Sequence, residues 1–140
     1  MRVTLAGLAD AATLSSDGKL NVLGIFDVIW AEKFPAAHPH CAYFARFEAE
    51  NAELGNNATK AVAIQLRVVD EDGGLAAPVA QMRGVLGRAP EGEMITAPLV
   101  LDITSATFKD PGTFTFELAI DGEVLGRTYL YVRKRPDAVK

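Results

Sequence analysis

Cysteine and long apolar runs are almost missing from this sequence. Cys41 is the one cysteine in 140 residues, so the chain cannot form an intrachain disulfide, and nothing in it favours an oxidising compartment. No apolar run reaches the ~18 residues that a transmembrane helix requires. Asp10, Asp17 and Lys19 interrupt the N-terminal stretch before it could serve as the apolar part of a secretory signal. We therefore expect a cytoplasmic protein.

The chain also lacks an excess of positive charge, since 18 acidic residues outnumber 14 lysine and arginine residues and the formal net charge is −4 at pH 7. Phosphate backbones and anionic membranes select for clustered lysine and arginine, so we expect neither a nucleic acid nor a membrane as partner. The chain is 49% hydrophobic and 23% charged, which is close to the average of globular proteins and predicts a folded core. We expect residues 1–135 to form one domain and residues 136–140 a flexible, charged tail.

The usual catalytic motifs are missing as well. The sequence contains no Walker loop, no dinucleotide-binding glycine fingerprint, no zinc-protease helix and no nucleophile elbow. Each of these motifs supplies a group that the corresponding chemistry cannot do without. We therefore expect that the protein is not an enzyme and that it needs no cofactor.

A regular series of turn signals separates short runs of alternating apolar residues. The turn signals lie at residues 15–18, 35–39, 55–57, 70–74, 90–92, 110–112 and 121–122. This spacing is typical of an all-β sandwich, and no segment shows the sustained apolar stripe of a helix. We predict an antiparallel β-sandwich of about seven to nine strands, with one short helical turn near residues 50–54.

The two ends of the chain each predict a hairpin. At the C-terminal end, the turn Asp121–Gly122 follows a strand whose core-facing residues are Phe114, Phe116, Leu118 and Ile120. At the N-terminal end, residues 3–14 and 19–30 flank a turn centred on Asp17–Gly18. This turn would place Leu8 opposite Asp27 and Asp10 opposite Ile25.

In that register, one face of the first hairpin carries the four large aliphatic residues Leu8, Leu23, Ile25 and Ile29. Such a patch is larger than scattered exposed apolar residues explain. One interpretation is that the true register differs, or that a loop over residues 31–40 covers the face. The other is that the face is an interface between identical subunits, because most oligomers are homomeric.

Two clusters could bind a metal ion. His38 and His40 lie beside Cys41 and offer imidazole and thiolate ligands, but no second cluster completes a zinc site. The acidic loop Asp70 to Asp72 could bind calcium, yet the following Gly73–Gly74 is equally well explained by a plain hairpin turn.

A third cluster is aromatic and basic. Tyr129 and Tyr131 alternate with inward-facing residues of the last strand and share their face with Arg127 and Arg133. Such a face could stack nucleobases, or it could be an ordinary ladder of side chains across strands.

Two stretches resemble known families. Residues 99–101, Phe108, Pro111–Phe114, Phe116–Leu118, Asp121–Gly122 and 130–132 look like the last three strands of an immunoglobulin-like sandwich. Residues 8–12, 17–21, 23–27 and Phe34–Pro35 resemble a family of small uncharacterised bacterial proteins. The resemblance implies an immunoglobulin-like sandwich from a bacterium, with no known activity and no catalytic residues.

Two hypotheses about function remain. The first is a non-enzymatic protein-binding or assembly module that works through a protein partner or through self-association as a homodimer. Its candidate residues are Leu8, Leu23, Ile25 and Ile29. The second is a module that binds a small ligand or a calcium ion through loops at one end of the sandwich, with Asp70, Asp72, His38 or His40 as ligands.

Overall fold

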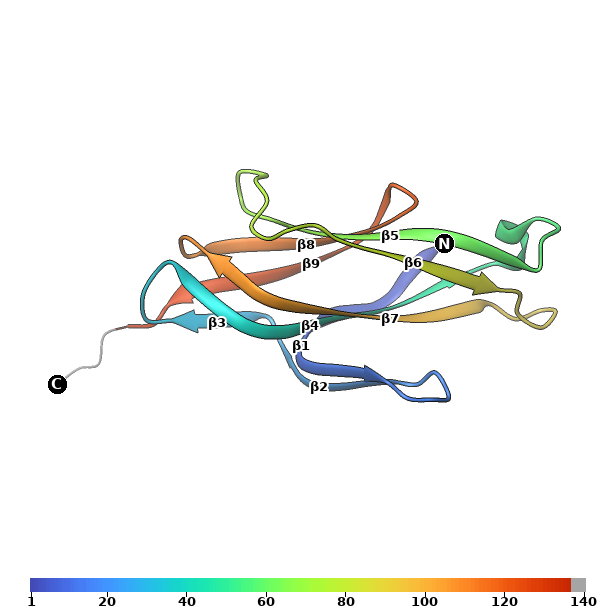
Figure 1. Cartoon of the computed structure of the whole chain (residues 1–140), viewed down its shortest axis with the longest axis horizontal. Coiled ribbons are helices and arrows are strands. Elements are labelled where there is room, and N and C mark those ends of the chain that lie inside the picture. The colour runs from blue at the N-terminus through green and yellow to red at the C-terminus, as the bar shows by residue number, and fades with distance from the viewer. Residues whose placement is uncertain (137–140) are drawn as a thin grey trace.

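The chain folds as two β-sheets packed face to face (Figure 1). A computed structural model describes residues 1–136, apart from the side chains of Pro39 and Ser105. The strands are β1 (Arg2–Leu14), β2 (Leu20–Phe26), β3 (Val28–Ala31), β4 (Ala36–Ala49), β5 (Thr59–Val69), β6 (Ala80–Gly87), β7 (Ile95–Phe108), β8 (Gly112–Ile120) and β9 (Glu123–Lys134). The all-β sandwich and the number of strands are confirmed.

The strand order divides the molecule into a four-stranded and a five-stranded sheet. The four-stranded sheet has the order β2-β1-β4-β7, and the five-stranded sheet has the order β3-β9-β8-β5-β6. β3 pairs with β9 in parallel, so the prediction of a fully antiparallel fold is wrong at this edge. The expected helical turn is present as the 3-10 helix Asn51–Leu54, and no helix among residues 1–136 is long and apolar enough to cross a membrane.

The hydrophobic core lies between the two sheets. Tyr43 of β4 stacks on Phe116 of β8 with ring centroids 6.4 Å apart. Phe108 of β7 meets Phe114 of β8 edge-on at 4.7 Å. The residues predicted to face the core from β8 are all buried. Each such side chain stabilises the fold by about 1.5–3 kcal/mol relative to an exposed position.

β4 and β7 run together over their whole length and change face near one end. Ile95 and Leu99 of β7 face the core, and Ala106 and Phe108 face it farther along the strand. The buried positions are therefore odd-numbered at the start of β7 and even-numbered at its end. The sequence predicted a strand ending at Ile103 and a loop before Cys41, because period-two alternation stops at the change of face.

The C-terminal hairpin matches its prediction. Asp121 has φ 51° and Gly122 has φ 84°, which are the left-handed conformations that a two-residue hairpin turn requires. Phe116 pairs with Thr128, and Phe114 pairs with Leu130. β9 continues to Lys134. Of the expected tail at 136–140, residues 137–140 lie outside the described part of the chain.

The N-terminal hairpin has a different register from the predicted one. Leu8 pairs with Phe26 and Ala9 pairs with Ile25, which is a shift of one residue. A shift of one residue exchanges the two faces of a strand. Leu8 therefore lies fully buried in the core, while Ile25 stays on the outer face.

The second strand of that hairpin divides at Asp27. The chain leaves the four-stranded sheet after Phe26 and joins the five-stranded sheet at Val28. The backbone carbonyl of Asp27 accepts a hydrogen bond of 2.8 Å from the amide of Tyr131 in β9. This change of sheet turns Ile29 inward, where it is half-buried against the core.

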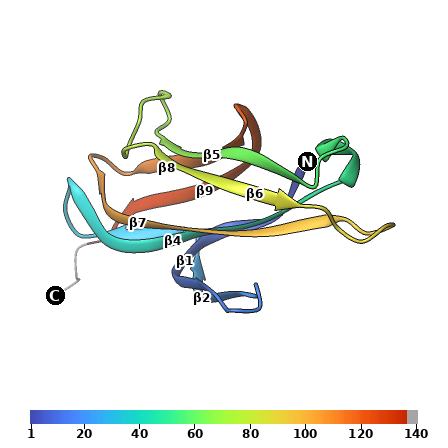
Figure 2. The ribbon, with the colours of Figure 1, turned by 45° about the vertical axis from the view of Figure 1, so that its right-hand side comes forward.

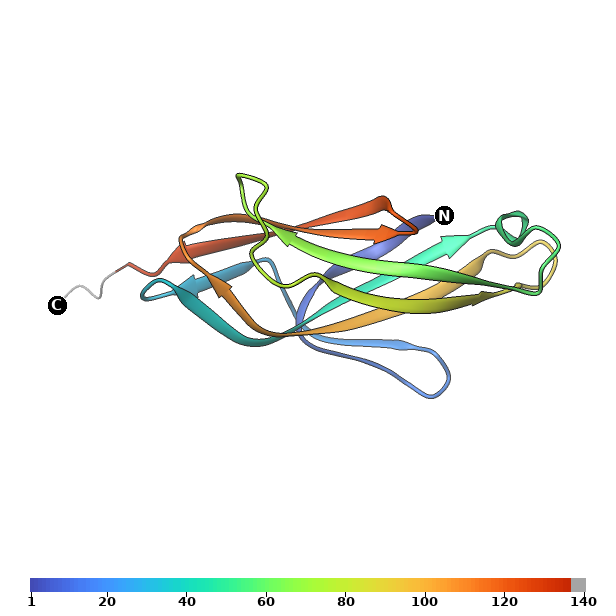
Figure 3. The ribbon, with the colours of Figure 1, turned by 45° about the horizontal axis from the view of Figure 1, so that its top comes forward.

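The tip of the first hairpin projects from the sandwich (Figures 2 and 3). β1 pairs with β4 only as far as Ala9, and farther along it pairs with β2 alone. We call residues 10–24 the hairpin arm. A two-stranded ribbon on its own is only marginally stable in water.

Gly24 is the more constrained of the two glycines in the arm. It has φ +74°, and a Cβ built there would lie 2.5 Å from Oδ2 of Asp10. We expect Gly24→Ala to cost about 2 kcal/mol in the free energy of unfolding, measured in urea, because backbone strain and the contact with Asp10 add. Gly18→Ala is the matched control, since Gly18 has φ +82° with nothing within 4 Å of its Cβ position. An equal cost at both glycines would contradict the contribution of Asp10.

Candidate functional site

The outer face of the four-stranded sheet carries a continuous apolar surface, which we call the apolar face. It comprises Leu5, Gly7, Ala9, Leu23, Ile25, Ala42, Phe44 and Val100. Leu23 is 72% exposed and Ile25 is 68% exposed. Leu5 is 49% exposed. Three large aliphatic side chains of one surface are thus largely open to water.

The cross-strand register gives this surface its shape. Ile25 of β2 lies opposite Ala9 of β1, which lies opposite Ala42 of β4. Gly7 lies opposite Phe44, which lies opposite Val100 of β7. These rows place small residues between larger ones.

The small residues lie at the centre of this surface. Ala9 and Ala42 have no exposed surface, and Phe44 is 2% exposed although it lies on an outer face. Its ring lies against Gly7, where a Cβ atom would come within 2.8 Å of Cζ. Small or buried side chains therefore occupy the centre of the apolar face, with Leu5 on one side and Ile25 and Leu23 on the other.

Charges of opposite sign lie at the two ends of the apolar face. Arg46 is exposed at one end, next to Leu5 in the register. Asp102 is exposed at the other end, opposite Ala42, and its Oδ1 lies 3.2 Å from Nε2 of His40. Beyond Arg46, the Arg2 guanidinium and the Glu48 carboxylate form an ion pair. One end of the face is thus basic and the other acidic.

Two of the four predicted interface residues belong to this face. Leu23 and Ile25 lie on it, as expected. Leu8 does not, because the one-residue shift in register turns it into the core. Ile29 does not, because it belongs to β3 in the other sheet. The predicted face of four residues is therefore corrected to one built on Leu5, Leu23 and Ile25.

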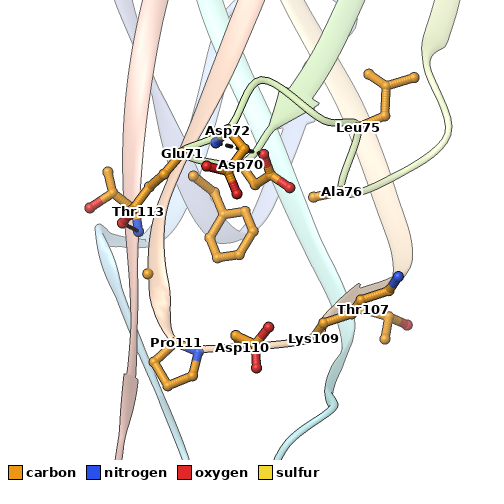
Figure 4. Close-up of a pocket in the computed structure, with 12 residues that line it drawn as sticks. Asp70, Glu71, Asp72, Leu75, Ala76, Thr107, Lys109, Asp110, Pro111 and Thr113 are labelled. Carbon is orange, nitrogen blue, oxygen red and sulfur yellow. Dashed lines mark hydrogen bonds between the residues drawn. The ribbon is translucent and has the colours of Figure 1, made fainter.

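The acidic loop lines a pocket of about 240 Å³ at one end of the sandwich (Figure 4). Oδ1 of Asp70 accepts hydrogen bonds from the amides of Asp72 and Gly74 at 2.9 and 2.8 Å. Oε1 of Glu71 accepts one from the amide of Thr113 at 2.8 Å. Two of the carboxylates therefore hold the loop in place, which agrees with the hairpin-turn interpretation.

The structure separates the histidines from the cysteine. His40 points to Asp102 on the outer face, whereas Cys41 is buried in the core. Burial raises the pKa of the Cys41 thiol to about 11, so the thiolate is scarce at neutral pH. His38 packs its ring against Phe26 with centroids 5.8 Å apart. Within residues 1–136, no three histidine, cysteine or carboxylate side chains are grouped so as to hold a metal ion.

Leu5, Gly7 and Phe44 also belong to the apolar face, although the sequence did not predict them there. A signal for it was available, since Gly7, Ala9 and Ala11 place small residues at every second position of β1. Alternating small residues indicate a face that another surface can approach closely. Phe44 could not be assigned, because the pairing of β1 with β4 brings together residues far apart in the sequence.

Comparison with known proteins identifies a family but no activity. A family model described as a family of unknown function (DUF6941) matches residues 4–133. No curated protein matches the chain. Among solved structures, the Pseudomonas fluorescens alkylpurine DNA glycosylase AlkC, bound to DNA containing an abasic site analog, is similar with a TM-score of 0.52 at 13% identity. The similarity covers 91% of this chain and 30% of that enzyme, so it shows a shared fold only.

Proposed function

We propose that this chain, which belongs to the DUF6941 family of unknown function, is a non-enzymatic protein-binding module that assembles through its apolar face. The observation that supports the proposal is the 68% exposure of Ile25 beside the 72% exposure of Leu23. Water around such a cluster is released when a partner covers it, and monomers rarely leave a contiguous apolar patch uncovered. A partner would also stabilise the hairpin arm, which no other strand supports.

The partner that the apolar face fits is a second copy of the same chain. A two-fold axis across the strands near Phe44 would turn Arg46 of one copy towards Asp102 of the other. The same axis would bring Ile25 of one copy beside Leu5 of the other, because these residues lie on opposite sides of Phe44 in the register. The small residues Gly7, Ala9 and Ala42 would allow the two sheets to approach. An interface of this kind is self-complementary in both shape and charge.

A protein-binding role requires little further chemistry from the chain. A binding module of this kind needs no cofactor and no catalytic group. We infer that it acts in the bacterial cytoplasm as an immunoglobulin-like sandwich. The resemblance of its opening and closing segments to such proteins and the single buried thiol support this inference.

The test is the mass of the assembly in solution. We expect light scattering after gel filtration to give twice the monomer mass for the natural chain. We expect Ile25→Asp to give the monomer mass with an unchanged circular dichroism spectrum, because burying an unpaired carboxylate in the interface costs several kcal/mol. Val85→Asp is the matched control, since Val85 is 69% exposed on the five-stranded sheet. It should leave the dimer intact.

Exchanging the charges of Arg46 and Asp102 distinguishes a specific interface from non-specific association of apolar surfaces. Arg46→Asp and Asp102→Arg should each weaken the dimer about tenfold, and the double variant should recover most of the loss, because the exchanged charges again face each other. A natural chain that stays monomeric at high concentration would overturn the proposal. Equal dissociation by Val85→Asp would overturn the assignment of the interface to this face.

A further inference from the structure

The outer face of the five-stranded sheet carries a cluster of exposed aromatic side chains. Trp30 of β3 is 49% exposed, Tyr129 of β9 is 50% exposed and Tyr131 is 37% exposed. The parallel pairing of β3 with β9 brings Trp30 beside Arg133 and Val28 beside Tyr131. We call Trp30, Tyr129, Tyr131 and Arg133 the aromatic platform. The sequence predicted the two tyrosines on this face but not the tryptophan.

The guanidinium of Arg133 lies between two of these rings. Its central carbon is 5.5 Å from the ring centroid of Trp30 and 5.8 Å from that of Tyr131. Both distances are within the range of cation–π attraction, which holds the side chain over the sheet. The positive charge is thus fixed among flat aromatic surfaces that are open to solvent.

Further positive charges continue along the same face. Arg127, Glu117 and Arg67 lie side by side on β9, β8 and β5. Nε of Arg127 lies 3.2 Å from Oε2 of Glu117, so this carboxylate offsets one of its two arginine neighbours. Arg135 is exposed where β9 ends, and the Glu71 carboxylate lies near the platform, where its Oε1 accepts a hydrogen bond from the amide of Thr113. The arginines Arg67, Arg127, Arg133 and Arg135 still outnumber the carboxylates Glu71 and Glu117. The formal charge of −4 is therefore unevenly distributed, and this face is locally basic.

We propose that the aromatic platform is a binding site for single-stranded nucleic acid. Nucleobases offer flat faces that stack on tryptophan and tyrosine, and the phosphates between them would contact Arg133, Arg127 and Arg67. The hydroxyls of Thr113 and Thr115, which lie opposite Tyr131 and Tyr129, add hydrogen-bonding groups beside the rings. A single strand fits better than a duplex, because the bases of a duplex are stacked on one another and cannot lie on the rings.

This proposal departs from the expectation drawn from the net charge, and it is independent of the proposed assembly. Net charge averages over the whole surface, whereas a flexible single strand responds to the charges within a Debye length of about 8–10 Å. The platform and the apolar face lie on different sheets. Loss of either activity therefore leaves the other testable.

Trp30 is the one tryptophan in the chain, so its fluorescence reports on the platform directly. We expect a thymidine oligonucleotide of about 15 residues to quench this fluorescence on titration, because site sizes for such surfaces are about 4–16 nucleotides. With three phosphate contacts, the logarithm of the binding constant should fall against that of salt concentration with a slope of about −2. Tyr131→Ala and Arg133→Glu should each weaken binding by at least about fivefold.

Arg83→Glu is the matched control, because it makes the same change of charge on β6, which is separated from β9 by β8 and β5. It should leave the affinity within about twofold, since a charge beyond a Debye length is largely screened. Equal quenching by polyglutamate would mean that any polyanion, including an acidic protein segment, binds here, and would overturn the proposal. Tighter binding of a duplex, or no quenching at low salt, would also overturn it.

Discussion

Gly7→Ala is expected to destabilise the protein by about 2–3 kcal/mol in urea unfolding. The new methyl group would come within 2.8 Å of Cζ and 3.1 Å of Cε1 of Phe44. The Phe44 ring is 2% exposed and has little room to move away, so the strand or the ring must shift. Overpacking of this kind costs about 1–3 kcal/mol, and this contact is with a rigid ring.

A loss of stability in Gly7→Ala is informative because replacing glycine by alanine within a strand usually raises the free energy of unfolding. Gly87→Ala in β6 is the control, since nothing lies within 4 Å of the Cβ position of Gly87. There we expect no loss, or a gain of about 0.4–1 kcal/mol, because alanine restricts the unfolded chain. Phe44→Leu should recover part of the loss in the Gly7→Ala background. A neutral Gly7→Ala variant would show that the ring does not lie against this glycine.

The second large effect is a loss of stability at high pH. Burial raises the pKa of the Cys41 thiol from 9.0 to about 11 and that of the Tyr43 phenol from 10.0 to about 12. Both groups lie in the core and are neutral at pH 7. In the unfolded chain they lose their protons at lower pH than in the folded chain. The unfolded state is therefore favoured increasingly as pH rises through this window.

Each shift corresponds to about 3 kcal/mol of stability, which is fully present below pH 9 for Cys41 and below pH 10 for Tyr43. The contribution of Cys41 is lost by about pH 11, and that of Tyr43 by about pH 12. We expect urea unfolding between pH 8 and 11 to show a steep fall in the natural chain. Cys41→Ala and Tyr43→Phe should each flatten the curve. Parallel curves for all three proteins would contradict the assignment.

How much of the fold could be predicted from the sequence depended on how far apart along the chain the paired strand residues lie. β8 and β9 were predicted with their core residues, because their alternation is regular and Asp121–Gly122 marks the turn. A bulge between Leu118 and Ala119 shifts the pairing by one residue and was not predicted.

The register of the first hairpin was predicted wrongly by one residue, because its loop has an odd number of residues. Leu14 pairs with Leu20, and the amide of Ser15 donates a hydrogen bond to the carbonyl of Lys19. A two-residue turn at Asp17–Gly18 would have had an even number of residues and would have given the predicted register.

The candidate surfaces were less predictable, because they join strands that are distant in the chain. Leu23 and Ile25 could be recognised as surplus apolar residues, yet their neighbours Ala42 and Phe44 follow only from the pairing of β1 with β4. Trp30 meets Arg133 only because the chain changes sheets at Asp27. No local pattern specifies that change of sheet, since it depends on which edge of the sandwich is open to another strand.

The change of sheet at Asp27 also determines how a dimer would bind a long ligand. Ile25 and Trp30 are five positions apart in sequence, yet they belong to the two outer faces of the sandwich. Two copies joined through their four-stranded sheets would carry their aromatic platforms on opposite outer sides. Such a pair would be bivalent, and a strand long enough to reach around it would meet the second platform at a high effective concentration. A strand too short to do so would bind each platform separately, so apparent affinity would rise steeply at one length of ligand.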